Sequence, residues 1–198
     1  MPRKKLIRSS EHVYHITTRS NSKEWFYLPL HECWNICVEL ISEGLERFSV
    51  ELHAFVLMNN HYHLMARFPK ANIDKFMHFY NKNMSRRINM STGRINHVFG
   101  GTYKWSLINS ERYYFNAIKY LYQNPVRANI CSRVEDYPYS TLHEKRYKIK
   151  TSSYLTSIDL HWMNELYSKE SVDRIRKGFK RTHFRPSYDK KRGHSELL

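Results

Sequence analysis

The sequence has no long apolar run and comparatively few acidic residues. No stretch approaches the roughly 20 consecutive apolar residues of a membrane-spanning helix, so we expect no membrane association. The opening MPRKKLIRSS is basic but lacks an apolar h-region, so we expect no secretory signal and a cytoplasmic location. Only 18 acidic residues stand against 33 Lys and Arg, which gives a net charge of +15. Proteins this basic typically bind polyanions, here nucleic acid, although a basic protein without such a partner is the alternative.

Cysteine is also scarce. There are three, Cys33, Cys37 and Cys131. An odd count without an export signal indicates reduced thiols in a cytosol. The spacing does not provide a Cys/His zinc site, so we interpret the cysteines as small core residues.

The rest of the composition is that of a globular protein with one core. The chain has 198 residues, of which 41% are hydrophobic and 15% aromatic. That length is sufficient for one domain with an appendage, and the composition excludes a disordered chain.

Seven segments have the hydrophobic pattern of a helix or strand. Alternation predicts strands over 12–19, 49–58, 61–68 and 102–108, with a tight turn at Asn59-Asn60. Apolar residues at helical spacing predict helices over 30–43, 72–90 and 110–124. We expect Gly44 to stop the first helix, Asn72 and Ser110 to cap the other two, and Pro125 to end the last.

This order predicts an α+β fold of the ferredoxin-like, split βαβ type. Its first six elements form an antiparallel sheet with packed helices, and the seventh is an additional helix. Beyond Pro125 the periodicity weakens, and residues 168–198 are basic. We found no internal repeats.

Two histidines in NNHYHLM are candidates for metal binding. Residues i and i+2 of a strand face the same side, so His61 and His63 project together while Tyr62 and Leu64 face the core. Two imidazoles side by side on a rigid strand make half of a metal site. The alternative is a hydrogen-bonded pair at a sheet edge.

The helix over 110–124 offers an amide and a phenol. Tyr120 and Asn124 are four residues apart, on one helix face. Mg²⁺ or Mn²⁺ would accept two imidazoles, an amide oxygen and a phosphate oxygen, and would polarise the phosphate for attack. A free tyrosine ionises at about pH 10, so its attack at neutral pH needs this help. Alternatively, Tyr120 packs its ring on the sheet.

The motifs MNNHYHLM (58–65) and KYLYQNPVRANI (119–130) together resemble the HUH-class single-tyrosine transposases, most closely the bacterial REP-associated tyrosine transposases. VYHITTRS, HVFGGTYKWSLI and VEDYPYS also resemble segments of that family. The similarity spans roughly residues 1–142, which we expect to be the catalytic domain. Residues 143–198 would be a basic C-terminal extension that contacts DNA or is partly disordered.

The resemblance implies an enzyme that cuts and rejoins single-stranded DNA. Tyr120 would be the nucleophile, forming a 5′-phosphotyrosine link and freeing a 3′-hydroxyl. His61 and His63 would bind Mg²⁺ or Mn²⁺, with Asn124 as third ligand. The family's partner is a short imperfect REP-like hairpin with a guide tetranucleotide beside it, in the bacterial cytoplasm at the nucleoid.

Two positions depart from the family pattern. Asn59 stands where the family commonly has Pro, and Tyr62 fills the middle of the HUH motif.

The chain also differs from the two-tyrosine nickases. A second nucleophile would lie one turn from Tyr120, where this chain has Asn116 and Asn124. We therefore expect one nucleophile per chain, in a monomer or homodimer.

Several basic residues are candidates for DNA contact, because cations among aromatics suit unpaired bases and their phosphates. They are Arg3, Lys4, Lys5, Arg19, Arg86, Arg87, Lys104 and Arg127. Two other functions stay open. One is a domesticated, non-cleaving DNA-binding protein or regulator acting on repeated hairpins. The other is a ferredoxin-like RNA-binding or RNA-cleaving protein, in which the Tyr120 helix has no role.

Overall fold

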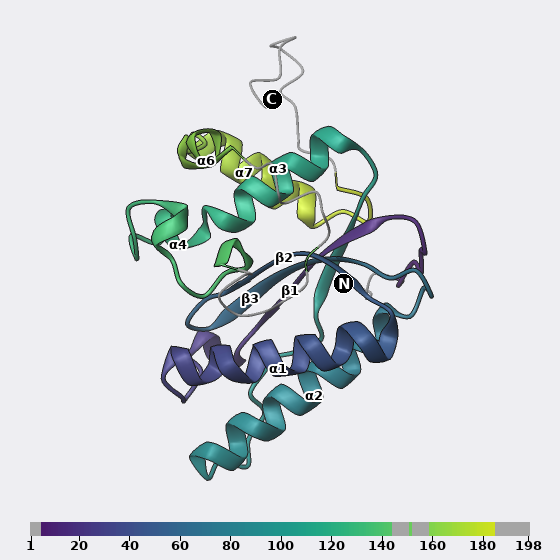
Figure 1. Cartoon of the computed structure of the whole chain (residues 1–198), viewed down its shortest axis with the longest axis vertical. Helices are drawn as coiled ribbons and strands as arrows, with labels where there is room; N and C mark the ends of the chain where they lie inside the picture. Colours follow the sequence, from purple (N-terminus) through teal and green to yellow (C-terminus); the bar gives the residue numbers. More distant parts are fainter. Residues whose placement is uncertain (1–4, 144–150, 152–158, 185–198) are drawn as a thin grey trace.

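An antiparallel sheet separates two layers of helices (Figure 1). The computed structural model describes residues 5–143, 151 and 159–184. Helices α1 (Leu30–Phe48) and α2 (Ile73–Thr92) cover one face, and α3 (Glu111–Tyr122), α6 (Leu160–Asn164) and α7 (Lys169–Phe179) lie over the other. The strands are β1 (Val13–Arg19), β2 (Glu51–Leu57), β3 (His61–Arg67) and β4 (Lys104–Ile108). The short α4 (Asn124–Arg127) follows α3, and 3₁₀ turns occupy Asn21–Lys23, Val134–Asp136 and Thr141–His143.

The strand order is β2-β3-β1-β4, with every neighbouring pair antiparallel. The elements follow the predicted order of strand, helix, strand, strand, helix, strand, helix. The predicted α+β, ferredoxin-like class is therefore confirmed. Each face of the sheet has its own apolar core, and the face under α3 is the one that carries His61 and His63.

The turn between β2 and β3 sets which side chains face α3. The Met58 backbone N–H donates to the carbonyl of His61 at 2.8 Å, which closes the turn. Tyr62 is fully buried in the core under α1 and α2, as the alternation predicts. Its hydroxyl accepts from Thr18 Oγ1 at 2.9 Å and donates to Asn81 Oδ1 at 2.5 Å, so the polar atom of this aromatic is satisfied.

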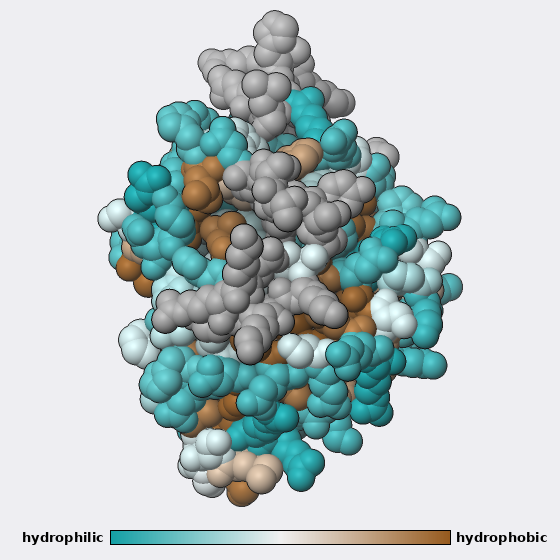
Figure 2. Space-filling view, in the orientation of Figure 1, coloured by the Kyte–Doolittle hydropathy of each residue, from teal (hydrophilic) through white to brown (hydrophobic). Residues whose placement is uncertain are grey.

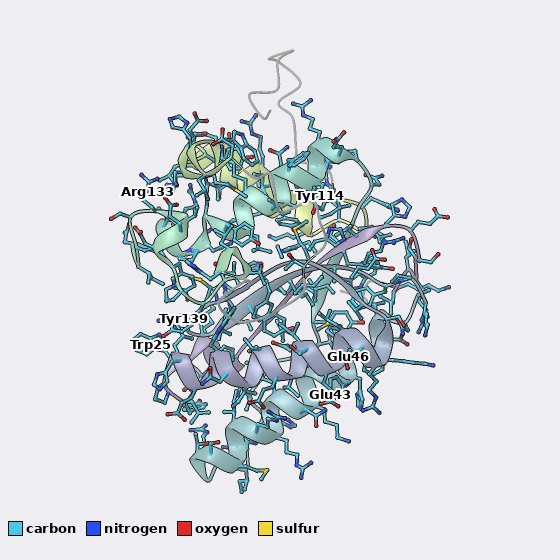
Figure 3. All side chains as sticks on the ribbon, viewed as in Figure 1. Trp25, Glu43, Glu46, Tyr114, Arg133 and Tyr139 are labelled. Carbon is cyan, nitrogen blue, oxygen red and sulfur yellow. The ribbon has the colours of Figure 1, made fainter. Side chains whose placement is uncertain are left out.

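The prediction that Gly44 stops the first helix is wrong. Helix α1 continues to Phe48 and ends where Ser49 takes a left-handed conformation, with φ of 54°. Gly44 instead faces α2, where a Cβ would lie 2.5 Å from the ring of Phe76. The missing side chain lets the two helices approach closely. Figure 3 labels Glu43 and Glu46, its neighbours on α1.

One of the two expected side-chain caps is present. Ser110 accepts from the Tyr113 N–H at 3.3 Å and so caps α3 as predicted. Asn72 occupies the N-cap of α2, but its side chain makes no capping bond there. Its Nδ2 donates instead to the Phe48 carbonyl at 3.0 Å, which ties the start of α2 to the end of α1.

Residues 159–184 pack on the α3 side of the sheet. Gln123, at the end of α3, donates from Nε2 to the Met163 carbonyl at 2.9 Å and to the Glu165 carbonyl at 2.8 Å. Beyond α7, the Phe184 N–H donates to the Leu107 carbonyl at 2.6 Å, which adds a backbone segment beside β4. The predicted domain boundary at 142/143 stays a prediction.

Polar side chains dominate the view of the surface over α1 and α2, and apolar residues are visible between the layers (Figure 2). Within the described residues, none of the helices has both the length and the apolar character that a membrane crossing requires.

Candidate active site

Three histidines from two adjacent strands meet beneath α3 and α7. His15 Nε2 lies 2.9 Å from His63 Nδ1, and the ring centroids of His61 and His63 are 5.2 Å apart. His15 and His63 are buried, while His61 is partly exposed at the start of β3. The predicted pair on β3 is therefore joined by a histidine of β1.

Burial keeps these imidazoles neutral. It lowers the pKa of His15 to about 3 and, together with the positive charge of Arg19, that of His61 to about 4. The pKa of His63 lies well below its ordinary value, first because of burial and then because of its histidine neighbours, Arg19 and Arg176. A neutral imidazole has a lone pair for a cation, which is the form that metal binding requires.

Tyr120 stands directly over this histidine cluster. Its ring is perpendicular to that of His63, at 88°, with the centroids 5.9 Å apart. Phe179 of α7 packs on its other side at 5.4 Å between centroids, so only 6% of Tyr120 is exposed. Arg176 Nε donates to the Tyr120 hydroxyl at 3.4 Å. Helix α3 thus brings a phenol, and α7 a guanidinium, to the histidines.

Asn124 follows one turn after Tyr120, at the start of α4. Its Nδ2 donates to the carbonyls of Tyr120 at 2.9 Å and Leu121 at 3.2 Å. Those bonds fix the amide so that its oxygen is the atom left for a cation. No hydrogen bond joins Asn124 to His61 or His63 in the described part of the chain, whereas Tyr120 contacts His63 through its ring.

The donor set suits a hard divalent cation. Among the described residues, no group of three His, Cys, Asp or Glu side chains could hold a metal ion. Two neutral imidazoles and an amide oxygen form a different set, and a phosphate oxygen would complete it. The ligand types of His61, His63 and Asn124 are therefore suitable for the expected Mg²⁺ or Mn²⁺.

Arg127 lies near both Arg176 and Tyr120, and Arg19 near the histidines. Arg127 Nη1 donates to the Tyr167 carbonyl at 2.9 Å. Burial, and next the repulsion from Arg176, lower the pKa of Arg127, while Tyr120 acts in the opposite direction. Arg19 ends β1 opposite His61 in the strand register. A phosphodiester placed at Tyr120 would meet this positive field.

Arg86 and Arg87 belong to α2, on the side of the sheet opposite to Tyr120. Arg86 is exposed on α2 and lines a groove with Arg47, Lys75 and Lys82. Arg87, its neighbour, forms an ion pair with Glu39. Lys5, and Lys104 at the start of β4, are exposed. Arg3 and Lys4 lie outside the described residues.

Sequence reasoning missed His15, Arg176 and Phe179. His15 lies in VYHITTRS, but the register that brings it to His63 is set by strand pairing. Arg176 and Phe179 belong to α7, an amphipathic helix within the basic segment for which no helix was predicted. The amphipathic pattern of that segment could have predicted the helix, although not its contact with Tyr120.

Comparison with known proteins places the chain in a family. Residues 8–127 match the family described as Transposase IS200 like. The fold is similar to a REP-associated tyrosine transposase bound to a REP hairpin, with TM-score 0.59 and 16% identity over 81% of this chain and 96% of that one. A chain from Deinococcus radiodurans R1, described as a transposase, matches with TM-score 0.41 and 17% identity over 65% and 92%. No curated protein matches.

The family match covers more than half of the sequence and includes both histidines of β3 and Tyr120. The chain is therefore a member of the IS200-like transposase family. The predicted family is confirmed, and the similar structure confirms the fold.

Proposed function

We propose that the protein is a metal-dependent endonuclease and strand transferase of single-stranded DNA, with Tyr120 as its nucleophile. The observation that supports this most is the contact of Tyr120 with His63, 5.9 Å between ring centroids, beside Arg176. It joins a nucleophile, candidate metal ligands and a phosphate-binding cation in one place. A ferredoxin-like RNA-binding protein would have no use for this arrangement.

The reaction is an in-line displacement at phosphorus. The Tyr120 oxygen forms a bond to phosphorus, the bond to the 3′ oxygen breaks, and the 5′ side stays linked to the protein as a phosphotyrosine. The phenolic proton leaves to water, and the departing 3′ oxygen takes a proton. Attack by a 3′-hydroxyl reverses the step and rejoins the strand. Because the phosphodiester is exchanged for a phosphotyrosine ester, rejoining the strand needs no energy-supplying cofactor.

The chain's own residues hold the reacting groups. His61 and His63, with Asn124, would hold Mg²⁺ or Mn²⁺, which when bound polarises the phosphate and offsets its developing charge. Arg176 donates to the Tyr120 oxygen and lies where it can neutralise the adjacent phosphate. Arg127 and Arg19 add positive charge around the same point.

The proposed substrate is a single strand that folds into a hairpin with REP-like character. It is supported by the similarity in fold to the transposase bound to a REP hairpin, and by the chain's charge of +15. The proposed setting is the bacterial cytoplasm at the nucleoid, with a monomer or homodimer as the active form. One tyrosine per site is consistent with the asparagines one turn from Tyr120, at positions 116 and 124.

Covalent capture tests the proposal. A labelled single-stranded hairpin is incubated with the protein and Mn²⁺ or Mg²⁺, and adducts are resolved by denaturing electrophoresis. We expect an adduct with wild type and with Tyr113→Phe, a matched change on the same helix, and none with Tyr120→Phe. His61→Ala should abolish cleavage. Failure of wild type to form an adduct, or cleavage by His61→Ala at the wild-type rate, would refute the proposal.

A second function, DNA binding without cleavage, has one observation in its favour. Tyr120 is 6% exposed and packs against Phe179 of α7, which restricts the approach of DNA to this side chain. A chain in which α7 stays in place would bind hairpins as a regulator. The capture assay combined with a native gel separates the two, because a regulator shifts the mobility of the hairpin in the native gel but forms no covalent product on the denaturing one.

A further inference from the structure

The histidines of β3 each have a hydrogen-bond partner at the ring nitrogen Nδ1. His61 Nδ1 is 2.7 Å from Asn60 Oδ1, and His63 Nδ1 is 2.9 Å from His15 Nε2. A metal-bound histidine usually donates its other ring N–H to a carboxylate, a backbone carbonyl or water, which fixes the tautomer and the ring plane, and an amide oxygen or a neutral imidazole nitrogen can accept in the same way. Both candidate ligands therefore have the surroundings of a metal-bound imidazole.

The orientation of Asn60 determines the tautomer of His61. Asn60 Nδ2 donates to the Lys23 carbonyl at 2.7 Å, so the amide oxygen is the atom that faces His61. An amide oxygen only accepts, so His61 must carry its proton on Nδ1. Its Nε2 then has the lone pair that binds a cation.

The contact of His63 with His15 is an in-plane hydrogen bond. The two rings are nearly parallel, at 22°, with centroids 5.1 Å apart. Two imidazoles joined edge to edge by a bond of 2.9 Å have about this separation, whereas face-to-face stacking brings rings closer. One proton lies in this bond, on either His63 or His15.

Only one of the two arrangements leaves His63 able to bind metal. If the proton is on His63 Nδ1, His15 accepts it and His63 Nε2 is free. If it is on His15, a neutral His63 carries its proton on Nε2 and that atom cannot bind a cation. Phe179 stacks on a face of His15, 3.7 Å between centroids and 27° between planes, and so fixes the plane in which His15 meets His63.

We propose that His15 and Asn60 are positioning residues that hold His63 and His61 in the Nδ1–H tautomer and so present both Nε2 atoms to one divalent cation. This rests on the proposed metal-dependent function. It assigns a role to β1, which brings no ligand of its own, and to the turn before β3. Neither residue touches the substrate or the cation.

Two measurements test the proposal, and the first needs no substitution. Long-range ¹H–¹⁵N correlation spectra of the metal-free protein distinguish the tautomers of each histidine. We expect His61 and His63 as Nδ1–H forms in wild type. His63 in the Nε2–H form would overturn the role of His15, even if His15 variants fail to fold.

The second measurement is Mn²⁺ affinity by calorimetry, without DNA. His15→Phe keeps the ring volume but removes the acceptor, and should weaken binding at least tenfold. His15→Gln places an amide oxygen near the position of Nε2 and should restore most of the affinity. Asn60→Ala, which removes the acceptor at His61, should also weaken binding. The matched control is His53→Gln, a buried histidine of β2 that bonds Tyr114.

The outcomes separate this inference from the proposed function. If wild type binds no Mn²⁺, the metal-dependent function fails. If wild type binds Mn²⁺ and His15→Phe binds it equally well with an unchanged His63 tautomer, the metal site stands and the positioning role is refuted. Loss of affinity in His53→Gln equal to that in His15→Phe would also refute it, because the effect would then be general to the sheet.

Discussion

The rings of Tyr120 and His63 are perpendicular to each other, 5.9 Å apart between centroids. This contact connects the helix that follows the ferredoxin-like unit to its central strands. It places the proposed nucleophile beside the proposed metal ligands of the same chain.

Arg176 should contribute to the cleavage step. Because its Nε donates to the Tyr120 oxygen at 3.4 Å, Arg176→Ala should lower the rate of adduct formation about tenfold to a hundredfold at saturating DNA. Lys177→Ala, which removes an exposed charge from the adjacent position, is the matched control and should change the rate little. Single-turnover kinetics measures both. Equal reductions in the two variants would mean that only net charge matters.

The groove between α1 and α2 should bind DNA phosphates through Lys82 and Arg86. Removing both charges should lower hairpin affinity and reduce the slope of log K against log salt by about 0.9 for each phosphate that is no longer neutralised. Arg87→Ala should have less effect, because Glu39 already neutralises that guanidinium. Fluorescence anisotropy over a salt series measures the slopes. An unchanged slope in the Lys82→Ala/Arg86→Ala variant would exclude this groove from the DNA-binding surface.

His53 should make the fold less stable in acid. Burial, partly offset by Glu51 and reinforced by Arg67, lowers its pKa to about 4. Between pH 6.5 and 4 the unfolded chain therefore binds a proton that the folded chain does not, so stability falls as the pH falls. Figure 3 labels Tyr114, the α3 residue whose hydroxyl bonds His53 Nδ1 at 2.9 Å.

The change is measured by urea unfolding of wild type and His53→Gln. The variant has no imidazole to protonate on unfolding. Between pH 7 and pH 5 its free energy of unfolding should therefore rise by roughly 2 kcal/mol relative to that of wild type. A stability difference that stays constant across this range would contradict the assignment.

Gly44→Ala should destabilise the contact between α1 and α2. The added methyl would meet the Phe76 ring at 2.5 Å, and that ring is confined by Tyr80, stacked at 5.9 Å. Overpacking of about 1–3 kcal/mol should exceed the helix-propensity gain of about 1 kcal/mol. Gly101→Ala, where a Cβ meets nothing within 4 Å, is the control for urea unfolding. A more stable Gly44→Ala variant would show that the helices separate easily.

The sequence was sufficient to predict the elements from β1 to α3, but not the later helices α6 and α7. Alternation in the strands and capping at Ser110 are local signals, and each appears where predicted. Gly44 shows the limit of such signals. Glycine is common just after a helix. Here, however, Gly44 lies inside α1 and allows α2 to pack closely against it, and this contact depends on packing between distant segments.

The site was also predictable only where it depends on residues close together in the sequence. His61 and His63 share a strand, so their common direction follows from the two-residue period. His15 is 48 residues from His63, and Arg176 is 56 residues from Tyr120. Strand register and helix docking bring those pairs together, and neither is determined by residues near them in the chain.

The decisive experiment is to identify the residue that becomes linked to DNA. The covalent complex formed with a single-stranded hairpin and Mn²⁺ is digested with trypsin and nuclease, and the nucleotide-bearing peptide is sequenced by mass spectrometry. We predict a 5′-phosphate ester on Tyr120 alone, absent from Tyr120→Phe. Linkage at Tyr113, Tyr122 or another residue, or strand cleavage without any covalent peptide, would contradict the assignment of Tyr120 as the nucleophile.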